Sequence, residues 1–312
     1  SLNKISFSSM DLESEEKPVH YVEVKVKRNK TIAIFFMFLT AFSQICLSIS
    51  SKFAYKNSSY LTGFDLLFAN SVLLVPIYSY LAVKRKVNVL NLATKTNLLL
   101  LTLRVLFGVS GTLLLFYSFK YATIGEAILV YNINPLIVII LGGCILCESV
   151  KLIEILLVIG AFIGVFMISH VTKIEGDVRI MGIYIALCAA FTDGCSFVFM
   201  RKLNEKEKIH WLISPFYLSS GYFVYSVSSY IMFTGTLNIF KYTSLDVLLL
   251  TILSIFEGLF QLFLSIAYKY ERASKLSPFL YISVLGSFIA DITIFNFSFT
   301  MKELFGVFVI VG

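Results

Sequence analysis

The sequence predicts an all-α polytopic membrane protein, and three observations lead to that prediction. Of its 312 residues, 58% are hydrophobic and 14% are charged, whereas soluble domains are about 45–50% apolar and about 25% charged. The mean hydropathy is +0.85. Apolar segments recur ten times after residue 30. We therefore expect ten transmembrane helices, with a lipid bilayer around most of the chain.

The first 30 residues differ from the rest of the chain. They hold an acidic cluster at 11–16 and a basic stretch at 25–30, which predicts a disordered cytoplasmic tail ending beside the membrane. The expected helices span residues 31–50, 63–83, 98–119, 123–146, 153–169, 180–200, 211–233, 245–268, 276–298 and 303–312. The last is too short to cross about 30 Å of hydrocarbon, so we expect the sequence to stop inside it.

Basic residues set the expected orientation. With a cytoplasmic N-terminus, sixteen Lys and Arg residues fall on the cytoplasmic side and seven on the outer side. The net charge of +7 therefore indicates membrane topology and does not indicate a nucleic-acid partner. Asn57 is the one N-x-[ST] sequon in an outer loop, and glycosylation there is left open.

The two halves of the chain resemble each other weakly. Residues 119–135 and 268–284 each contain a Lys-Tyr pair, a short connection and a span with a proline. Five spans separate the two copies, and an odd number inverts the second relative to the first. Inverted repeats are typical of secondary transporters, whose solute sites lie near the middle of the membrane. We expect one five-helix repeat at 31–170 and a second at 171–312.

The segment from 118 to 168 resembles the EamA-type domain of the drug/metabolite transporter superfamily. The matching positions are Pro135 inside the fourth helix, Glu148 at its cytoplasmic end and Gly164 in the fifth helix, with Arg104 near the start of the third. Among eukaryotic branches the chain looks most like solute carrier family 35. The resemblance implies ten helices in a duplicated EamA fold, and export or exchange of small metabolites. Leu157 stands where the family often has Gly.

A proline among polar residues marks the fourth expected helix as a solute-binding element. Pro135 lacks an N–H group, and its ring clashes with the carbonyl of Tyr131. Within a membrane such a break is tolerated only against protein or a water-filled cavity. Tyr131 and Asn134 share a helical face, so we expect them to line a central cavity. The alternative is a kink sealed by neighbouring helices, with the amides in interhelical hydrogen bonds.

Carboxyl groups inside expected spans are candidates for coupling transport to an ion. Glu257 lies at the centre of the eighth span, where the ionised form is costly. Proton coupling and a structural hydrogen bond both fit it. Asp193 and Asp291 also lie inside spans and are reserve candidates. The expected solute site is completed by Gln261 of the eighth helix and by Ser43 and Gln44 of the first.

Two more charges have structural interpretations. Arg104 is expected to extend toward the cytoplasm or to pair with an acid, in preference to holding an anionic solute. Glu148 meets the negative end of a helix dipole. We therefore expect it to be a structural tie or gate that pairs with Lys151 or caps the next helix.

Features typical of enzymes are missing from the sequence. It has no HExxH, GxSxG or phosphate-binding glycine loop. Cys144 and Cys147 lie on an apolar helix and are interpreted as packing residues, so neither a metal nor a cofactor is expected. Gly160 and Gly164 form a GxxxG pattern, which permits a homodimer or close packing within one chain.

The leading functional hypothesis is a secondary transporter of a small organic solute that works by alternating access, with proton coupling as an option. Two alternatives stay open. One is an exchanger of nucleotide sugars or phosphorylated metabolites, for which Arg104 and Lys275 supply few cations. The other is a non-transporting scaffold, whose polar residues would be sealed by packing. The membrane is either the plasma membrane or that of the Golgi or endoplasmic reticulum.

Overall fold

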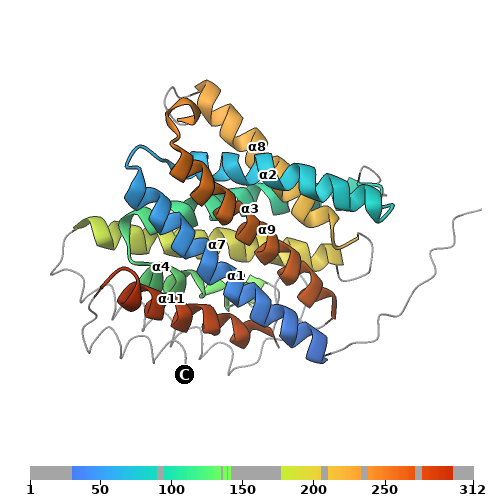
Figure 1. Cartoon of the computed structure of the whole chain (residues 1–312). Coiled ribbons are helices and arrows are strands. Elements are labelled where there is room, and N and C mark those ends of the chain that lie inside the picture. The colour runs from blue at the N-terminus through green and yellow to red at the C-terminus, as the bar shows by residue number, and fades with distance from the viewer. Residues whose placement is uncertain are drawn as a thin grey trace, which may run out of the picture.

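The computed structural model describes residues 30–89, 95–134, 136–138, 140–141, 177–204, 210–232, 238–270 and 276–297. All regular structure in these residues is helical. The helices pack into one bundle, and their ends lie at its two opposite ends (Figure 1). The tail and the expected spans at 153–169 and 303–312 lie outside the described residues. Ten helices therefore remain a prediction.

The first three helices lie close to the expected spans. They are α1 (Lys30–Asn57), α2 (Gly63–Lys84) and α3 (Lys95–Tyr121). The first helix continues past residue 50, where its sequence turns polar. Ser48, Ser50 and Ser51 each donate a hydrogen bond to a carbonyl one turn earlier, so their hydroxyls are satisfied within the helix.

The second half contributes α7 (Asp177–Asn204), α8 (Ile213–Met232) and α9 (Ser244–Tyr270), with the 3₁₀ turn η2 (Ile239–Lys241) before α9. Among the described residues, five helices are long and apolar enough to cross a membrane: α1, α2, α3, α7 and α9. Their outward faces expose large apolar side chains, including Phe35, Phe42 and Phe191. The protein is therefore a multi-pass integral membrane protein.

The fourth expected span is interrupted, as its proline predicts, and residues 142–146 at its end lie outside the described residues. The ninth is shorter than predicted, which corrects the boundaries 276–298. Helix α4 (Ile124–Tyr131) ends four residues before position 135, and the chain turns at Asn132. Helix α11 (Tyr281–Thr293) starts only after the 3₁₀ turn η3 (Ser277–Leu280). Proline at positions 135 and 278 explains both interruptions. The two breaks meet, because Asn132 donates to Ser283 Oγ at 3.0 Å and to the Leu280 carbonyl at 3.5 Å.

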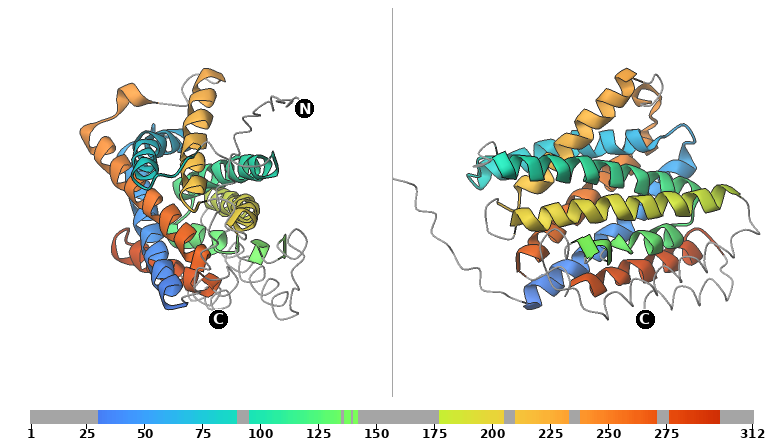
Figure 2. Two further views of the ribbon diagram at one scale, coloured as in Figure 1. Left: turned by 90° about the vertical axis from the view of Figure 1, so that its right-hand side faces the viewer. Right: turned by 180° about the vertical axis from the view of Figure 1, so that it is seen from behind.

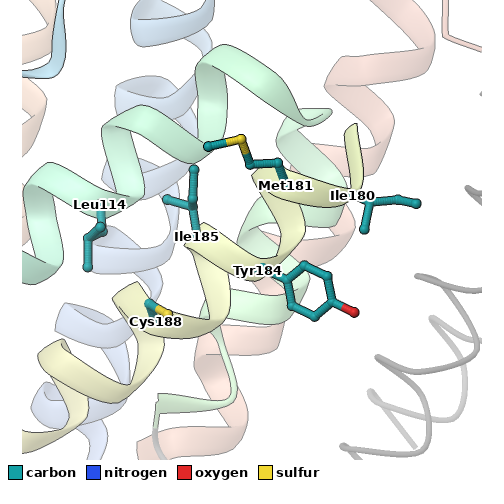
Figure 3. Close-up of a pocket in the computed structure, with 6 residues that line it drawn as sticks. All are labelled: Leu114, Ile180, Met181, Tyr184, Ile185 and Cys188. Atoms are coloured by element: carbon teal, nitrogen blue, oxygen red, sulfur yellow. The ribbon is translucent and has the colours of Figure 1, made fainter. Parts of the chain in front are cut away.

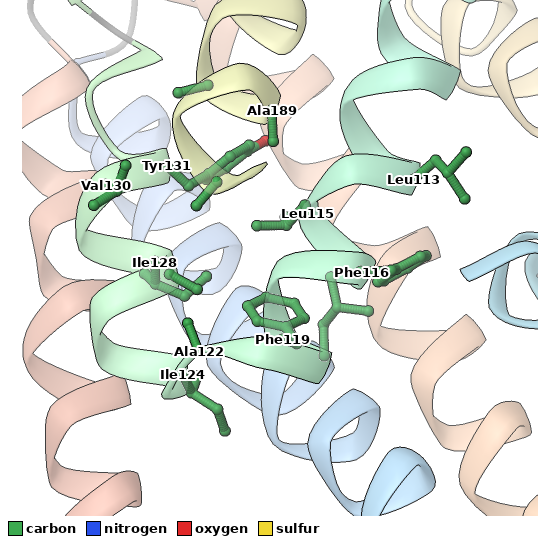
Figure 4. Close-up of a cluster of buried hydrophobic side chains, with 14 of the residues drawn as sticks. Leu113, Leu115, Phe116, Phe119, Ala122, Ile124, Ile128, Val130, Tyr131 and Ala189 are labelled. Carbon is green, nitrogen blue, oxygen red and sulfur yellow. The ribbon is translucent and has the colours of Figure 1, made fainter. Parts of the chain in front are cut away.

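The helices pack in pairs. In the end-on view of Figure 2, α1 lies beside α9 and α3 lies beside α7. Helix α2 contacts α8 and α9, and α4 contacts α11 and α7. A β-carbon on Gly182 of α7 would lie 2.7 Å from the backbone nitrogen of Ala122, so this approach requires glycine. Figure 4 shows the apolar core between α3, α4 and α7, which includes Phe119 and Ile128.

The two ends of the bundle differ in charge. We call one the capped end, at which α2, α4, α7 and α9 begin and α11 finishes (left in Figure 1). It holds five of the seven acidic residues in the described part of the chain: Asp65, Glu126, Asp177, Asp246 and Asp291. The opposite, basic end holds eight Lys and Arg residues and, among the described residues, no acid. This asymmetry supports a cytoplasmic basic end.

Candidate functional site

Five helices place polar side chains around the middle of the bundle, and these form the central network. Its members are Arg104 and Thr112 of α3, Tyr131 of α4, Asp193 and Ser196 of α7, Tyr222 of α8, and Glu257 and Gln261 of α9. Each is at most 7% exposed. The network therefore joins both halves of the chain inside an apolar bundle, where polar groups need partners.

Asp193 is held between α3 and α4. Its Oδ2 accepts a hydrogen bond from the Tyr131 hydroxyl at 2.9 Å. Gly111 of α3 leaves room for this carboxyl group, because a β-carbon there would lie 2.5 Å from Asp193 Oδ1. Figure 4 shows the Tyr131 ring pointing across the core toward α7. Tyr131 thus contacts one of the predicted coupling acids.

Glu257 is the centre of a hydrogen-bonded chain. Its Oε1 accepts from the Tyr222 hydroxyl and from Gln261 Nε2, both at 2.9 Å. The Tyr222 hydroxyl lies 3.1 Å from Thr112 Oγ1 on α3. Both of these donors bind Oε1, and the described contacts include no hydrogen bond to Oε2. This oxygen is available to a proton or to a donor on a solute.

Arg104 lies inside the bundle, which corrects the expectation that it reaches toward the cytoplasm. Its side chain is 1% exposed. Nη1 donates to Ser196 Oγ, and Nη2 donates to Gln261 Oε1 at 3.2 Å. Gln261 therefore connects the guanidinium to Glu257. Its amide oxygen accepts from Arg104 and its amide nitrogen donates to Glu257, and these two contacts set the orientation of the amide. The Nε atom has no partner among the described residues.

The charges of the central network do not balance. It contains one guanidinium and two carboxyl groups, so with all three ionised its net charge is +1 − 2 = −1. Asp193 and Glu257 both act electrostatically on Arg104, and Asp193 acts more strongly. An unbalanced charge in a low-dielectric interior is costly. Among the described residues, a proton on one carboxyl group or a bound cation would remove this excess negative charge.

The remaining predicted site residues in the described part of the chain make no side-chain hydrogen bond to the network among the described contacts. Ser43 donates to the Leu39 carbonyl of its own helix at 2.8 Å. Gln44 and Asn134 are buried, and the oxygen of each amide has no partner among the described residues. Asp291 accepts from the backbone nitrogens of Ile124, at 3.2 Å, and Gly125, so it caps α4. Pro135 and Glu148 lie outside the described residues.

Three grooves are described, and all lie on the outer faces of helices. One of about 310 Å³ separates α3 from α8 and includes Gly221. A second groove, of about 330 Å³, is lined by residues of the interrupted fourth helix and by Phe191. The third, of about 390 Å³, is lined by Leu114 and five residues of α7 and is shown in Figure 3. Tyr131 and Glu257 line none of the three, so a central cavity remains a prediction.

Sequence reasoning missed two sets of residues. Tyr222 is one of several Ser and Tyr residues on α8. Its hydrogen bonds in the structure distinguish it from the others, and the sequence does not show them. The second set is three capping boxes at the capped end: Thr62 with Asp65, Thr123 with Glu126, and Thr243 with Asp246. The pattern T-x-x-[DE] before an apolar run was the available signal.

Comparison with known proteins agrees with this architecture. Residues 31–170 match the model of the EamA-like transporter family. Members of this family are transporters, which supports a membrane transporter in general. The EamA-like segment contributes Arg104, Thr112 and Tyr131 to the central network.

A solved crystal structure has a similar fold. Its TM-score is 0.64 at 16% sequence identity, over 91% of this chain and 95% of that one. At this identity the likeness shows the fold alone. No curated protein matches the chain.

Proposed function

We propose that the protein is a secondary transporter of a small organic solute, and that the central network couples solute movement to a proton. The observation that carries this proposal is the charge imbalance among Arg104, Asp193 and Glu257. The family match supports transport in general, and the network supplies a buried group that needs a proton or a cation.

The geometry gives the two acids different roles. Asp193, held by the Tyr131 hydroxyl and packed against Gly111 of the helix that carries Arg104, is the lasting counter-charge of the guanidinium. Glu257 reaches Arg104 only through Gln261. It therefore takes up the proton when the network is closed to water and releases it when water enters. Tyr131 and Tyr222 hold the two acids in place as hydrogen-bond donors.

The alternatives account for these contacts less well. A diphosphate needs fixed cations, whereas the one guanidinium here is already engaged and is outnumbered by carboxyl groups. A purely structural core would gain nothing from an uncompensated acid, because burying one is costly. In proton-coupled transport, the additional carboxyl group would bind and release the coupled proton.

The helix pairs support two repeats that move against each other. In two equivalent repeats, α1, α2, α3 and α4 of the first would correspond to α7, α8, α9 and α11 of the second. The contact between α1 and α9 would then have a counterpart between α7 and α3. The contact between α1 and α11 would have a counterpart between α7 and α4. All four pairs are present. Alternating access in such folds is a rocking of one repeat against the other around a central site.

The test is an uptake screen in proteoliposomes made with the purified protein. A panel of amines, amino acids, sugars and phosphorylated metabolites would be offered with and without a pH gradient. We expect accumulation of at least one class that depends on the gradient. If no solute enters faster than into protein-free liposomes, the proposal of transport is wrong.

A further inference from the structure

The capped end carries a set of contacts that the central network does not use. Four buried or half-buried carboxylates there each accept hydrogen bonds from the opposite half of the chain. We propose, on the basis of the proposed transport function, that Asp65, Glu126, Asp246 and Asp291 form a lock that closes this end of the carrier.

Two of the ties involve α4. Glu126 accepts a two-pronged ion pair from Arg179 of α7, with Nη2 2.7 Å from Oε1 and Nε 3.0 Å from Oε2. Such paired contacts are stronger and more directional than single ones. Asp291 of α11 binds the first two backbone nitrogens of α4, where the helix dipole favours a negative charge. Residues of the second half thus hold the start of α4 from two sides.

The other two ties join the loops before α2 and α9. Asp65 accepts from the Asn238 nitrogen and from the Tyr242 hydroxyl, each at 2.7 Å. Asp246 accepts from Asn57 at 2.9 Å, from Ser58 at 2.7 Å and from Tyr60 at 2.5 Å. Each acid caps its own helix and also accepts from the facing half.

The two tyrosines remain donors at neutral pH. The hydrogen bond to Asp246 raises the pKa of Tyr60 above its ordinary value of about 10. Burial and the hydrogen bond to Asp65 raise the pKa of Tyr242 well above the same value. The ties therefore do not weaken through loss of a phenolic proton.

A neutral hydrogen bond joins the two halves at the basic end. There, the Tyr217 hydroxyl donates to the Val89 carbonyl at 3.1 Å, a neutral hydrogen bond between the halves. Charge-assisted hydrogen bonds are about twice as strong as neutral ones. The charge-assisted contacts of the lock stabilise a state that is closed at the capped end. The lock must break before the central network can face that side.

The lock can be tested without knowing the solute. Ser287→Cys is the reporter, because Ser287 is buried one turn inside Asp291 and its hydroxyl has no partner among the described residues. The rate at which a polar maleimide labels this cysteine would be measured in lipid nanodiscs. The signal from the protein without the substitution, which reports the native cysteines, would be subtracted. Arg179→Gln should raise the rate by about tenfold or more, because it removes both charge-assisted hydrogen bonds to Glu126 and the loss of even one shifts the closed-to-open ratio by that order.

Tyr217→Phe is the matched control, because it removes a tie between the halves at the basic end. It should leave the labelling rate within about twofold of the parent. Tyr60→Phe serves as a second lock variant if Arg179→Gln does not fold, and it should raise the rate in the same direction. An unchanged rate in folded lock variants, or an equal rise in Tyr217→Phe, would overturn the lock. Absence of transport with the rates changed as expected would instead count against the proposed function alone.

Discussion

Glycine at position 111 shows how a single residue positions the central acid. Asp193 lies directly against the backbone of α3 at this point, and its other side receives the Tyr131 hydroxyl. Any side chain at 111 would move the carboxyl group away from Tyr131. Glycine here is therefore a requirement of packing and of the network together.

Gly111→Ala should lower stability by about 1–3 kcal/mol, the usual range for overpacking a buried site. It should also reduce transport, because Asp193 cannot keep its contact with Tyr131. Thermal unfolding in detergent and uptake in proteoliposomes measure the two effects. Ser110→Ala, at the half-buried neighbouring position, should change neither. Equal behaviour of the two variants would show that Asp193 tolerates displacement.

The sequence identified several network residues but could not predict their partners. Tyr131, Asp193, Glu257 and Gln261 follow from polarity at mid-span, because burying such groups requires a purpose. Their partners come from helices distant in sequence: Tyr222 lies 35 residues before Glu257 and Ser196 lies 92 residues after Arg104. The same reasoning could not predict that Asp291 accepts hydrogen bonds from the first backbone nitrogens of α4, because that contact depends on how the two helices pack.

At the scale of helices, the boundaries follow local chemistry. Apolar runs predicted the positions of α1, α2, α3, α7, α8 and α9. Proline predicted the break in the fourth span, and underestimating Pro278 made the ninth span too long. Three helices begin with a capping box at the capped end. The start of each of these helices is therefore fixed by a pair of side chains four residues or fewer apart.

Thr243→Val should destabilise the protein by about 1 kcal/mol, because it removes the side-chain oxygen that accepts from the Asp246 nitrogen. The variant also loses the hydroxyl that donates to Asp246. Thr251→Val on the same helix is the control, since its exposed hydroxyl bonds only to the Val247 carbonyl one turn earlier. Unfolding midpoints of both variants, compared with the parent, decide the result. A larger loss in Thr251→Val would contradict the role of the cap.

At the scale of the molecule, the distribution of charge gives the expected orientation. The basic end should face the cytoplasm because Lys and Arg are retained there, and the acids of the capped end should face the opposite side. Weak similarity between the halves suggested an inverted repeat, and the helix pairs support it. Sequence alone could not show which helices pair, because those contacts form across the whole chain.

Cysteine labelling tests the orientation. With a membrane-impermeant reagent, Arg85→Cys should react only from the cytoplasmic side and Lys241→Cys only from the other side. The same proteins treated after permeabilisation give the total reactivity of each position. Labelling of position 85 from the non-cytoplasmic side would reverse the assignment of both ends.

The central claim is that Glu257 carries the coupled proton, and Glu257→Gln tests it most directly. Glutamine keeps the size of the side chain and can still accept from Tyr222, but it cannot titrate. Uptake would be measured in proteoliposomes in two ways, driven by a pH gradient and by solute counterflow at equal pH. The account predicts that the variant loses its response to the gradient while counterflow continues. Full gradient-driven uptake by Glu257→Gln would contradict it.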